Sequence, residues 1–317
     1  MIAVHLEKGR VEVRRAPKPR RREGFSLIRL LAAGICNTDL ELQRGYYGFR
    51  GRPGHEFAGE VVESDTRELI GKRVVGEINL ACNRCEWCAR SLRRHCPVRT
   101  VLGIVKHPGA FAEFLTLPDR NLHVVPEGIP VEHAVFVEPL AAACEILEQV
   151  NIPKGERLAV LGDGKLGLLV AQVLSVWGAR VIVFGRHREK LRIAAAAGAE
   201  TEMAGKRMPV AEFDYVVDVT GSPEGLRTAV QMTRPRGTVV MKSTVHGPVS
   251  MDSAPIIVNE ITLVGSRCGR FSPALKLLKT GKVRVEEMLS DNFRLQDAPK
   301  ALARAGQRGV LKVLLSV

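Results

Sequence analysis

A glycine-rich turn, GDGKLG at residues 162–167, restricts the fold of this chain more than any other feature of its sequence. The turn follows RLAVL at residues 157–161, which predicts a buried strand, and precedes LGLLVAQVL at residues 166–174, which fits a helix. A GxGxxG pattern is weak evidence by itself, but a strand before it and a helix after it are the setting in which dinucleotides bind. The alternative is a glycine turn that only begins a helix and binds no ligand.

The three glycines of this turn have different predicted roles. Gly162 permits the tight turn, Gly164 lets the backbone approach a pyrophosphate, and Gly167 allows the helix to pack closely on the strand. Lys165 and Leu166 begin the helix, whose free N–H groups and partial positive charge would face the phosphates. We therefore predict that this turn binds a dinucleotide cofactor.

Strand-like and helix-like segments alternate from about residue 152 onward. Continuous apolar strands that alternate with helices indicate a parallel sheet covered by helices on both faces. Together with the glycine turn, this pattern predicts an α/β domain with a doubly wound parallel sheet of the Rossmann type. The predicted strands are residues 157–162, 180–185, 214–221, 237–243 and 260–266, and the predicted helices are residues 166–178, 188–198 and 223–232.

The first third of the chain has a different pattern. Short segments rich in β-branched residues are interrupted by Gly or Pro, which indicates a compact β domain, and 317 residues suffice for two domains. After Gly265, residues 271–283 are predicted to be helical and residues 309–317 to form a strand that could return to the first domain. The predicted strands of the first third are residues 11–15, 26–31, 56–63, 72–78 and 112–117.

The second strand of the predicted Rossmann sheet ends at Gly185 and not at an acidic residue. An NAD-binding unit usually has Asp or Glu here, about 20 residues after the turn, to bind the ribose hydroxyls. The missing carboxylate removes repulsion of a 2′-phosphate, and the guanidinium groups of Arg186 and Arg188 suit such a phosphate. We therefore predict NADP(H) over NAD(H), with Thr220 as a further cofactor-binding residue. The alternative is that the two arginines only begin a solvated helix.

Four of the seven cysteines lie close together, with the spacing C-x2-C-x2-C-x7-C. Such short intervals allow four thiolates of one loop to converge on a single zinc ion. Four sulfur ligands leave no open position for water or substrate, so a site of this kind is structural. An iron–sulfur cluster is an open alternative, whereas a nucleic-acid-binding zinc ribbon usually pairs two CxxC motifs across a longer gap. The four residues are Cys82, Cys85, Cys88 and Cys96.

A second set of residues with metal-binding side chains is scattered along the chain. Cys36, His55 and Glu138 would supply one thiolate, one imidazole and one carboxylate, and Glu56 follows His55 directly. Three protein ligands leave a fourth position for water or a substrate oxygen, which is the arrangement of a catalytic zinc site. Taken singly, however, a buried cysteine or a hydrogen-bonded histidine is more often structural, so spacing alone gives this set little support.

The net charge of +13 raises the question of a nucleic-acid partner. The densest basic run, RRAPKPRRR at residues 14–22, contains two prolines and no aromatic residues for base stacking, which favours a solvated surface loop. No apolar run approaches the ~18 residues of a membrane helix, and the first ten residues contain charges that do not fit a signal peptide. We therefore expect a cytoplasmic protein with reduced cysteines, no membrane association and no nucleic-acid partner.

Taken together and in order, these motifs resemble the zinc-containing medium-chain dehydrogenase/reductase family, which includes alcohol, sorbitol, threonine and glucose dehydrogenases. The resemblance implies a GroES-like β-rich catalytic domain at residues 1–138 with a structural-zinc lobe at 82–96. A Rossmann domain at 139–266 and a segment at 267–317 that returns to the catalytic domain are implied as well. The matching segments are GICNTDLE at 34–41, GHEFAGEVVE at 54–63, the four-cysteine loop, VEPLA at 137–141 and GDGKLG.

The resemblance also implies a ligand set. It makes Cys36, His55 and Glu138 ligands of a catalytic zinc ion, and VEPLA is similar to the polyol and glucose dehydrogenase branches. Glu56 corresponds to the family's neighbouring glutamate, which is either an alternate ligand or a residue just outside the ligand set. Asp39 corresponds to the aspartate that orients the zinc-binding histidine.

Three further residues are implied to take part in the reaction. Thr38 matches the hydroxyl residue that relays the substrate proton. Glu41 stands where many members have the histidine that completes this relay, so Glu41, or the cofactor ribose with water, would serve instead. Arg267 resembles an arginine that approaches substrate and cofactor in the sorbitol dehydrogenase branch.

The implied function is a zinc-dependent oxidoreductase that interconverts an alcohol or polyol and its carbonyl by hydride transfer with NADP(H). The resemblance further implies two zinc ions per chain, one catalytic and one structural, and a homodimer or homotetramer. One alternative is a zinc-free quinone or enone reductase on the same fold, against which the ligand set and the four-cysteine loop argue. The other is a zinc-stabilised nucleic-acid-binding protein.

Overall fold

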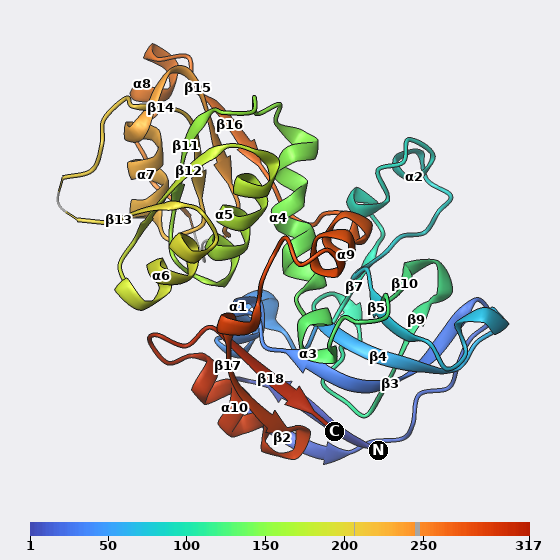
Figure 1. The fold of residues 1–317 in the computed structure, drawn as a ribbon. Coiled ribbons are helices and arrows are strands. Elements are labelled where there is room, and N and C mark those ends of the chain that lie inside the picture. The colour runs from blue at the N-terminus through green and yellow to red at the C-terminus, as the bar shows by residue number, and fades with distance from the viewer. Residues whose placement is uncertain (206, 245–247) are drawn as a thin grey trace. The chain divides into compact units, whose positions relative to one another are not determined.

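The computed structural model describes residues 1–205, 207–244 and 248–317 (Figure 1). The chain divides into two compact units. The first contains Met1–Glu138, Ala274–Lys279 and Leu289–Val317, and the second contains Pro139–Pro273 and Thr280–Met288. Among the described residues, no helix combines the length and the apolar character that crossing a membrane requires.

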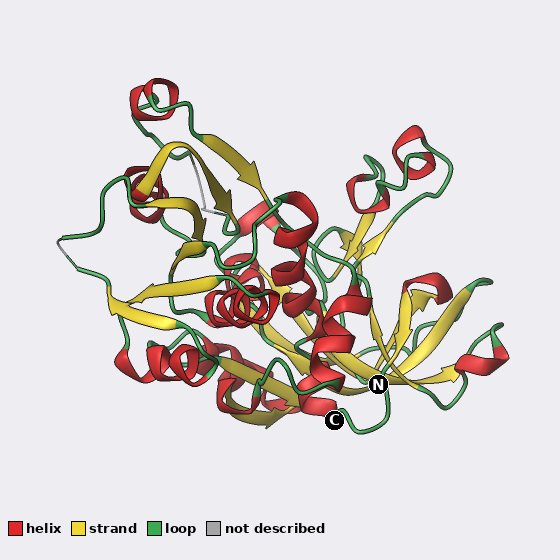
Figure 2. Ribbon diagram, turned by 45° about the horizontal axis from the view of Figure 1, so that its top comes forward, coloured by secondary structure: helices red, strands yellow, loops and turns green. Residues whose placement is uncertain are grey.

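The second unit is built on a six-stranded sheet in which all neighbouring strands are parallel (Figures 1 and 2). Numbered within this unit, the strands have the order 3-2-1-4-5-6, which is the Rossmann order and confirms the predicted fold. The order reverses between the first and fourth strands, which is where such sheets bind their ligands. In spatial order the strands are β13 (Glu200–Met203), β12 (Arg180–Gly185), β11 (Arg157–Leu161), β14 (Phe213–Asp218), β15 (Thr233–Met241) and β16 (Thr262–Gly265).

Helices connect these strands and cover their apolar side chains. α5 packs on β12, α6 on β13, and α7 on β14 and β15. α7 begins at an N-cap, Ser222, whose hydroxyl accepts a hydrogen bond from the Gly225 N–H at 3.1 Å, and Pro223 follows at its first position. The helices are α4 (Val137–Gln149), which belongs to this unit from Pro139 onward, α5 (Lys165–Trp177), α6 (Arg188–Ala196), α7 (Pro223–Met232) and α8 (Ala254–Val258).

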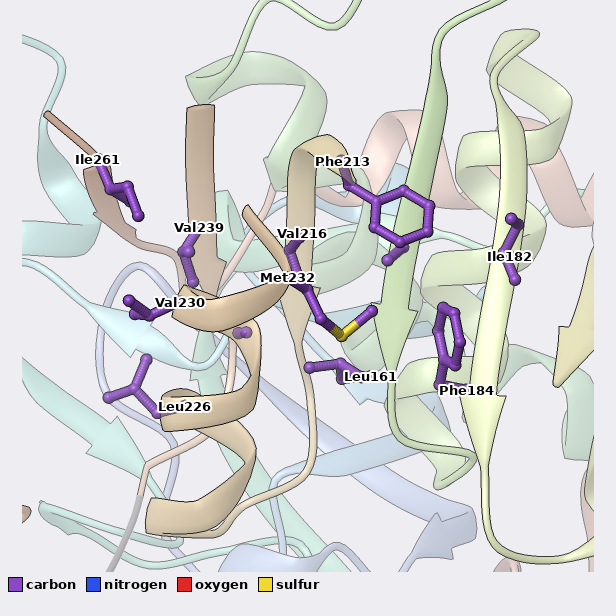
Figure 3. Close-up of a cluster of buried hydrophobic side chains, with 12 residues drawn as sticks. Leu161, Ile182, Phe184, Phe213, Val216, Leu226, Val230, Met232, Val239 and Ile261 are labelled. Carbon is purple, nitrogen blue, oxygen red and sulfur yellow. The ribbon is translucent and has the colours of Figure 1, made fainter. Parts of the chain in front are cut away.

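One hydrophobic cluster of this unit joins the sheet to α7 (Figure 3). The rings of Phe184 on β12 and Phe213 on β14 meet edge to face with centroids 6.0 Å apart, a geometry that aromatic pairs prefer. Leu226 and Val230 are four positions apart on α7, so one face of the helix supplies both side chains to this cluster. The cluster fixes the strands whose ends carry the glycine turn.

The first unit contains a seven-stranded sheet, a hairpin and a small three-stranded sheet. In the large sheet only β17 and β18 are parallel to each other, and the remaining pairs are antiparallel. Its order is β10 (Leu122–Val124), β5 (Arg73–Gly76), β4 (Glu56–Glu63), β3 (Phe25–Gly34), β18 (Lys312–Ser316) and β17 (Leu289–Arg294), and β9 (Phe114–Pro118) also pairs with β3. The hairpin is β1 (Ile2–Glu7) with β2 (Arg10–Arg15), and the small sheet is β6 (Asn79–Leu80), β7 (Thr100–Leu102) and β8 (Lys106–His107).

The end of the chain belongs to this first sheet. β18 pairs with β3 through Leu314 opposite Gly34, so the C-terminal strand completes a sheet that began near residue 25. α10 packs on β18 and β2 through four buried residues, Ala298, Ala301, Leu302 and Ala305. The helices of this unit are α1 (Asn37–Gln43), α2 (Glu86–Ala89), α3 (Val131–Ala134) and α10 (Ala298–Ala305), and α9 (Phe271–Lys279) belongs to it from Ala274 onward.

Three elements of the second unit were not predicted: β13, α4 and the short helix α8. β13 has the sequence ETEM and lies at the end of the sheet, where a strand contacts one neighbour and needs no apolar run. α4 was missed because VEPLAAACEILEQ contains a proline at residue 139, near the start of the helix, where proline is tolerated. β15 also begins four residues earlier than the predicted strand 237–243.

Candidate metal centres and cofactor turn

The four cysteine thiols of residues 82–96 converge in a lobe that extends from the strands of the first unit around α2 (Figure 1). Cys85 Sγ lies 3.5 Å from Cys88 Sγ and 3.8 Å from Cys96 Sγ. Cys82 Sγ lies 4.0 Å from Cys88 Sγ and 3.6 Å from Cys96 Sγ. Each thiol therefore has two sulfur neighbours within 4.0 Å, and all four sulfurs lie within 4.8 Å of one another.

These distances fit one tetrahedral ion. With Zn–S bonds of about 2.3 Å, the sulfurs of a tetrahedral zinc site lie about 3.8 Å apart. The four measured separations, 3.5 to 4.0 Å, bracket this value. A [4Fe–4S] cluster binds each thiolate through a different iron, and a [2Fe–2S] cluster binds two thiolates on each of two irons, so both hold some of the cysteine sulfurs farther apart. The geometry of the lobe therefore favours a single zinc ion over a cluster.

The protonation of these thiols also favours a bound cation. A hydrogen bond from the Arg84 backbone lowers the pKa of Cys82 to about 6. For Cys85, the backbone N–H of Cys88 acts in the same direction, but burial and the neighbouring thiols raise the pKa to about 11. One thiolate thus forms readily, whereas a second beside it needs a positive charge between them.

A second potential metal site forms between segments far apart in sequence. One ligand atom each from Cys36, His55 and Glu56 lies within 4.8 Å of the others. Cys36 precedes α1, His55 precedes β4, and Glu56 is the first residue of that strand. His55 and Glu56 are buried, and Cys36 is half-buried. The fold therefore brings together three residues that the sequence placed in two separate motifs.

Asp39 connects the two segments that carry these side chains. This residue is fully buried at the third position of α1, and its Oδ2 accepts the Cys36 N–H at 2.9 Å. Its Oδ1 accepts the Gly54 N–H at 3.1 Å, next to His55. Gly54 has a φ of +96°, and a Cβ there would collide with the Phe111 ring, so the turn before His55 requires glycine.

The imidazole of His55 is oriented by the same carboxylate. Nδ1 lies 3.5 Å from Asp39 Oδ1, which is a charge contact too long for a good hydrogen bond. Burial alone would lower the pKa of His55, but Asp39 and then Cys36 outweigh it and raise the pKa well above its ordinary value. This is the carboxylate–histidine pairing that supports histidine ligands in metal sites.

Lys312 is the residue of this site that the sequence reading missed. Its ammonium group is hydrogen-bonded to Glu56 Oε2 and lies 5.3 Å from the centroid of the Phe136 ring. Burial would lower the pKa of Lys312, but Glu56, Cys36 and Glu138 together raise it. A lysine in the apolar segment VLKVLLSV was a signal in the sequence, because a lysine among buried residues is almost always paired with an opposite charge.

The donor set suits a divalent cation. Cys36, Glu56 and Glu138 can each carry a negative charge beside the single ammonium group of Lys312, and buried charges need compensation. Glu138, the second residue of α4, does not belong to the group of three side chains that converge within 4.8 Å. A thiolate, an imidazole and a carboxylate are the ligand types that zinc accepts, so the residues present fit this ion.

The two candidate relay residues lie on α1. Thr38 Oγ1 is 3.8 Å from Cys36 Sγ, so the hydroxyl is next to the converging side chains. Glu41 instead forms an ion pair with Arg44 at 2.5 Å. Arg267 belongs to the second unit and has an exposed side chain, while its carbonyl accepts a hydrogen bond from Lys242 Nζ at 2.9 Å.

The glycine turn lies between β11 and α5, as the sequence predicts. Gly162 has a φ of +116°, and a Cβ there would lie 2.9 Å from the Val219 carbonyl oxygen. A Cβ on Gly167 would overlap the Gly162 carbonyl oxygen, whereas a Cβ on Gly164 would meet no atom within 4 Å. Two glycines therefore close the turn and the third leaves open space, which fits a pyrophosphate that approaches the backbone. Lys165 and Leu166 begin α5 and are half-buried.

The remaining predicted cofactor residues lie at the ends of β12 and β14. Gly185 is the last residue of β12, and Arg186 and Arg188 after it are exposed. Thr220 follows β14, and its backbone and hydroxyl both donate to Asp218 Oδ1, at 2.9 and 2.7 Å. β11 and β14 are neighbours at the point where the strand order reverses, so Thr220 lies next to the glycine turn.

Comparison with known proteins gives these sites a context. The model for the alcohol dehydrogenase GroES-like domain matches residues 22–127, and that for the zinc-binding dehydrogenase domain matches residues 166–280. The D-altritol 5-dehydrogenase of Agrobacterium fabrum is 31% identical, and the alignment covers 92% of each chain. The chain belongs to the zinc-containing medium-chain dehydrogenase/reductase family.

Other members of this family match the chain over nearly its whole length. The sorbitol dehydrogenase of Halalkalibacterium halodurans is 27% identical over 97% of this chain and 96% of its own. A crystal structure from Sinorhizobium meliloti 1021 with bound NADP superposes with a TM-score of 0.92 and 29% identity, covering 100% of this chain and 99% of the other. Membership in the family confirms the predicted GroES-like and Rossmann folds. It also identifies the general activity as that of an oxidoreductase.

Proposed function

We propose that the chain is a zinc-dependent dehydrogenase that interconverts an alcohol or polyol and its carbonyl with NADP(H). The observation that carries this proposal is the convergence of Cys36, His55 and Glu56 within 4.8 Å, with Asp39 bonded to both segments. The substrate class follows from the relatives, which include a sorbitol dehydrogenase and a D-altritol 5-dehydrogenase.

Cys36 and His55 would hold the catalytic zinc ion, with Glu138 or Glu56 as the carboxylate ligand. A bound zinc ion stabilises negative charge on a substrate oxygen, and a bound nicotinamide supplies the hydride acceptor or donor. Thr38 would relay the hydroxyl proton of an alcohol outward, accepting it while its own hydroxyl proton passes on, because this hydroxyl lies beside Cys36 Sγ. Asp39 would keep His55 in the orientation that ligation requires.

The cofactor preference rests on the end of β12. Gly185 offers no carboxylate for ribose hydroxyls, and the exposed guanidinium groups of Arg186 and Arg188 suit a 2′-phosphate. The NADP bound in the related Sinorhizobium meliloti structure is consistent with this preference. The four-cysteine lobe would hold a second zinc ion with a purely structural role.

A homodimer is supported by one edge of the parallel sheet. β16 is the end strand in the described part of the sheet, and Leu263 on it is 38% exposed. Ile257 and Val258 at the end of α8, just before this strand, are 70% and 78% exposed. An unpaired edge with apolar side chains is suited to pairing with a second copy of itself.

The proposal is tested by metal analysis together with cofactor kinetics. The purified protein should contain two zinc ions per chain, and it should oxidise members of an alcohol and polyol panel with a higher kcat/KM for NADP+ than for NAD+. The Cys36→Ser variant should lose turnover while it keeps its fold and one zinc ion. A wild-type protein that reduces quinones or enones but leaves every alcohol and polyol unchanged would contradict the proposed reaction, and a clear NAD+ preference would contradict the proposed cofactor.

A further inference from the structure

Asp163, the second residue of the glycine turn, lies next to Gly185, the position at which an NAD-binding Rossmann domain carries its acidic residue. The residue is 7% exposed. A Cβ built on Gly185 would lie 2.7 Å from both Cβ and Oδ2 of Asp163 and 2.8 Å from Leu191 Cδ2. A side chain at position 185 is therefore incompatible with Asp163 in its present position, so the two positions cannot both carry an acid.

The carboxylate of Asp163 is bound to the segment that follows Gly185. Oδ2 accepts the backbone N–H groups of Arg186 at 2.7 Å and His187 at 2.6 Å. The His187 ring contributes a third contact, with Nδ1 at 3.0 Å from Oδ2 and 3.1 Å from Oδ1. These donors occupy both carboxylate oxygens of Asp163. The carboxylate is therefore not available to bind the ribose hydroxyls, as an acid at the end of the second strand would.

The charged state of Asp163 suits this role. Burial on its own would raise the pKa of the carboxyl, but the hydrogen bonds from His187 and Arg186 outweigh burial and lower the pKa. Two backbone donors and one ring donor thus stabilise the ionised form at neutral pH. The carboxylate holds the backbone of two consecutive residues, and the exposed side chains of Arg186 and Arg188 begin at this fixed backbone.

We propose that Asp163 is a positioning residue for cofactor choice, which fixes the segment 186–188 so that Arg186 and Arg188 bind a 2′-phosphate. This inference rests on the proposed NADP(H) preference. Guanidinium groups bind phosphate through planar, paired hydrogen bonds. A fixed backbone raises their affinity for phosphate because less conformational entropy is lost on binding. Asp163 acts through these arginines and does not contact the phosphate itself.

The test uses the adenosine half of the cofactor, whose binding needs neither substrate nor hydride transfer. Adenosine 2′,5′-bisphosphate and 5′-AMP are titrated calorimetrically into the full-length protein and into D163A, D163N and R186A. The ratio of the two Kd values isolates the contribution of the 2′-phosphate. Amide hydrogen exchange of the peptide that contains Arg186 and His187 reports separately on whether Asp163 holds this segment. D214A, at an exposed site on β14, is the matched control.

In the wild type, adenosine 2′,5′-bisphosphate should bind at least about tenfold more tightly than 5′-AMP. D163A should reduce this ratio about tenfold, approaching R186A, and should accelerate exchange around Arg186. D163N should keep most of the ratio, because its amide oxygen can still accept both backbone N–H groups, and D214A should change nothing.

Equal weakening of both ligands by D163A, unchanged exchange, or tighter 2′-phosphate binding without the carboxylate would each overturn the inference. A wild type that binds 5′-AMP as tightly as the bisphosphate would instead contradict the proposed NADP(H) preference. If, in that case, amide exchange around Arg186 were still faster in D163A than in the wild type, Asp163 would hold this segment as inferred, but in an enzyme that uses NAD(H). The two failures are thereby distinguished.

Discussion

The ammonium group of Lys312 is paired with the carboxylate of Glu56, and each side chain is only 1% exposed. The two residues are 256 positions apart and lie on β18 and β4, on either side of β3. Gly34 at the end of β3 makes room for the pair, because a Cβ there would lie 2.6 Å from Glu56 Oε2 and 3.2 Å from Lys312 Cδ. The C-terminal strand thus contributes directly to the candidate catalytic metal site.

We expect Lys312→Met to destabilise the protein strongly. The variant leaves Glu56 buried without its counter-charge, and breaking a buried pair on one side costs about 3–5 kcal/mol. Urea unfolding measures this loss. The double variant Lys312→Met with Glu56→Gln should recover much of it, because no uncompensated charge remains. Lys300→Met is the exposed control, since its pair with Asp297 is a surface contact worth at most about 1 kcal/mol. Equal effects at both lysines would contradict this account.

The sequence was sufficient for features that depend on local order. The spacing of Cys82, Cys85, Cys88 and Cys96 predicts one closed site, and their thiols do converge. The alternation after residue 152 predicts a parallel sheet because strand–helix–strand units leave little choice of connection. Lys312 and Asp163 escaped prediction for different reasons. The partner of Lys312 is remote in sequence, and the GxGxxG pattern leaves the position of Asp163 unspecified, although an acid in a predicted phosphate-binding turn is itself a signal.

Introducing the missing acid at Gly185 should fail unless Asp163 is removed. Gly185→Asp alone places a side chain within 2.7 Å of Asp163, so we expect a poorly folded protein or one with weak cofactor binding. Gly185→Asp combined with Asp163→Gly should restore folding and shift the ratio of kcat/KM for NADP+ and NAD+ toward NAD+ by about tenfold or more, because the new carboxylate binds ribose hydroxyls and repels a 2′-phosphate. Circular dichroism and steady-state kinetics measure both effects. A single variant as stable as the wild type would contradict the steric argument.

Asp163 should also give the folding stability a defined dependence on pH. Its pKa is lower in the folded protein than the ordinary value of 3.8. A lowered carboxyl pKa contributes stability that is fully present above the unfolded pKa and is lost as pH falls through the folded pKa. The difference in unfolding free energy between wild type and D163N should therefore be constant from pH 7 to about pH 4 and shrink below that. A difference that grows toward low pH in urea unfolding experiments would refute the assignment.

The two metal centres should separate cleanly on mutation. Cys36→Ser should lower turnover more than about 100-fold, since loss of even an outer partner of a ligand costs about 10–100-fold, while the melting temperature changes little. Cys85→Ser should lower the zinc content and the melting temperature, because a closed structural site contributes its binding energy, roughly 10 kcal/mol or more, to folding. Elemental analysis and calorimetry distinguish the variants. If Cys85→Ser lost turnover while its melting temperature and the mass of its oligomer stayed unchanged, the assigned roles of the two metal centres would be wrong.

The exposed edge beside β16 should determine the oligomeric state. Ile257 and Val258 are 70% and 78% exposed, and placing a charge on each should prevent two copies from burying this surface together. The double variant Ile257→Asp with Val258→Asp should therefore run as a monomer in light-scattering chromatography at concentrations where the wild type is at least a dimer. Val210→Asp is the matched control, because Val210 is 76% exposed in the same unit but lies outside this edge. If Val210→Asp dissociated the protein and the double variant did not, the interface would lie elsewhere on the surface. A dimer in which β16 of one copy pairs with β16 of the other would then be ruled out.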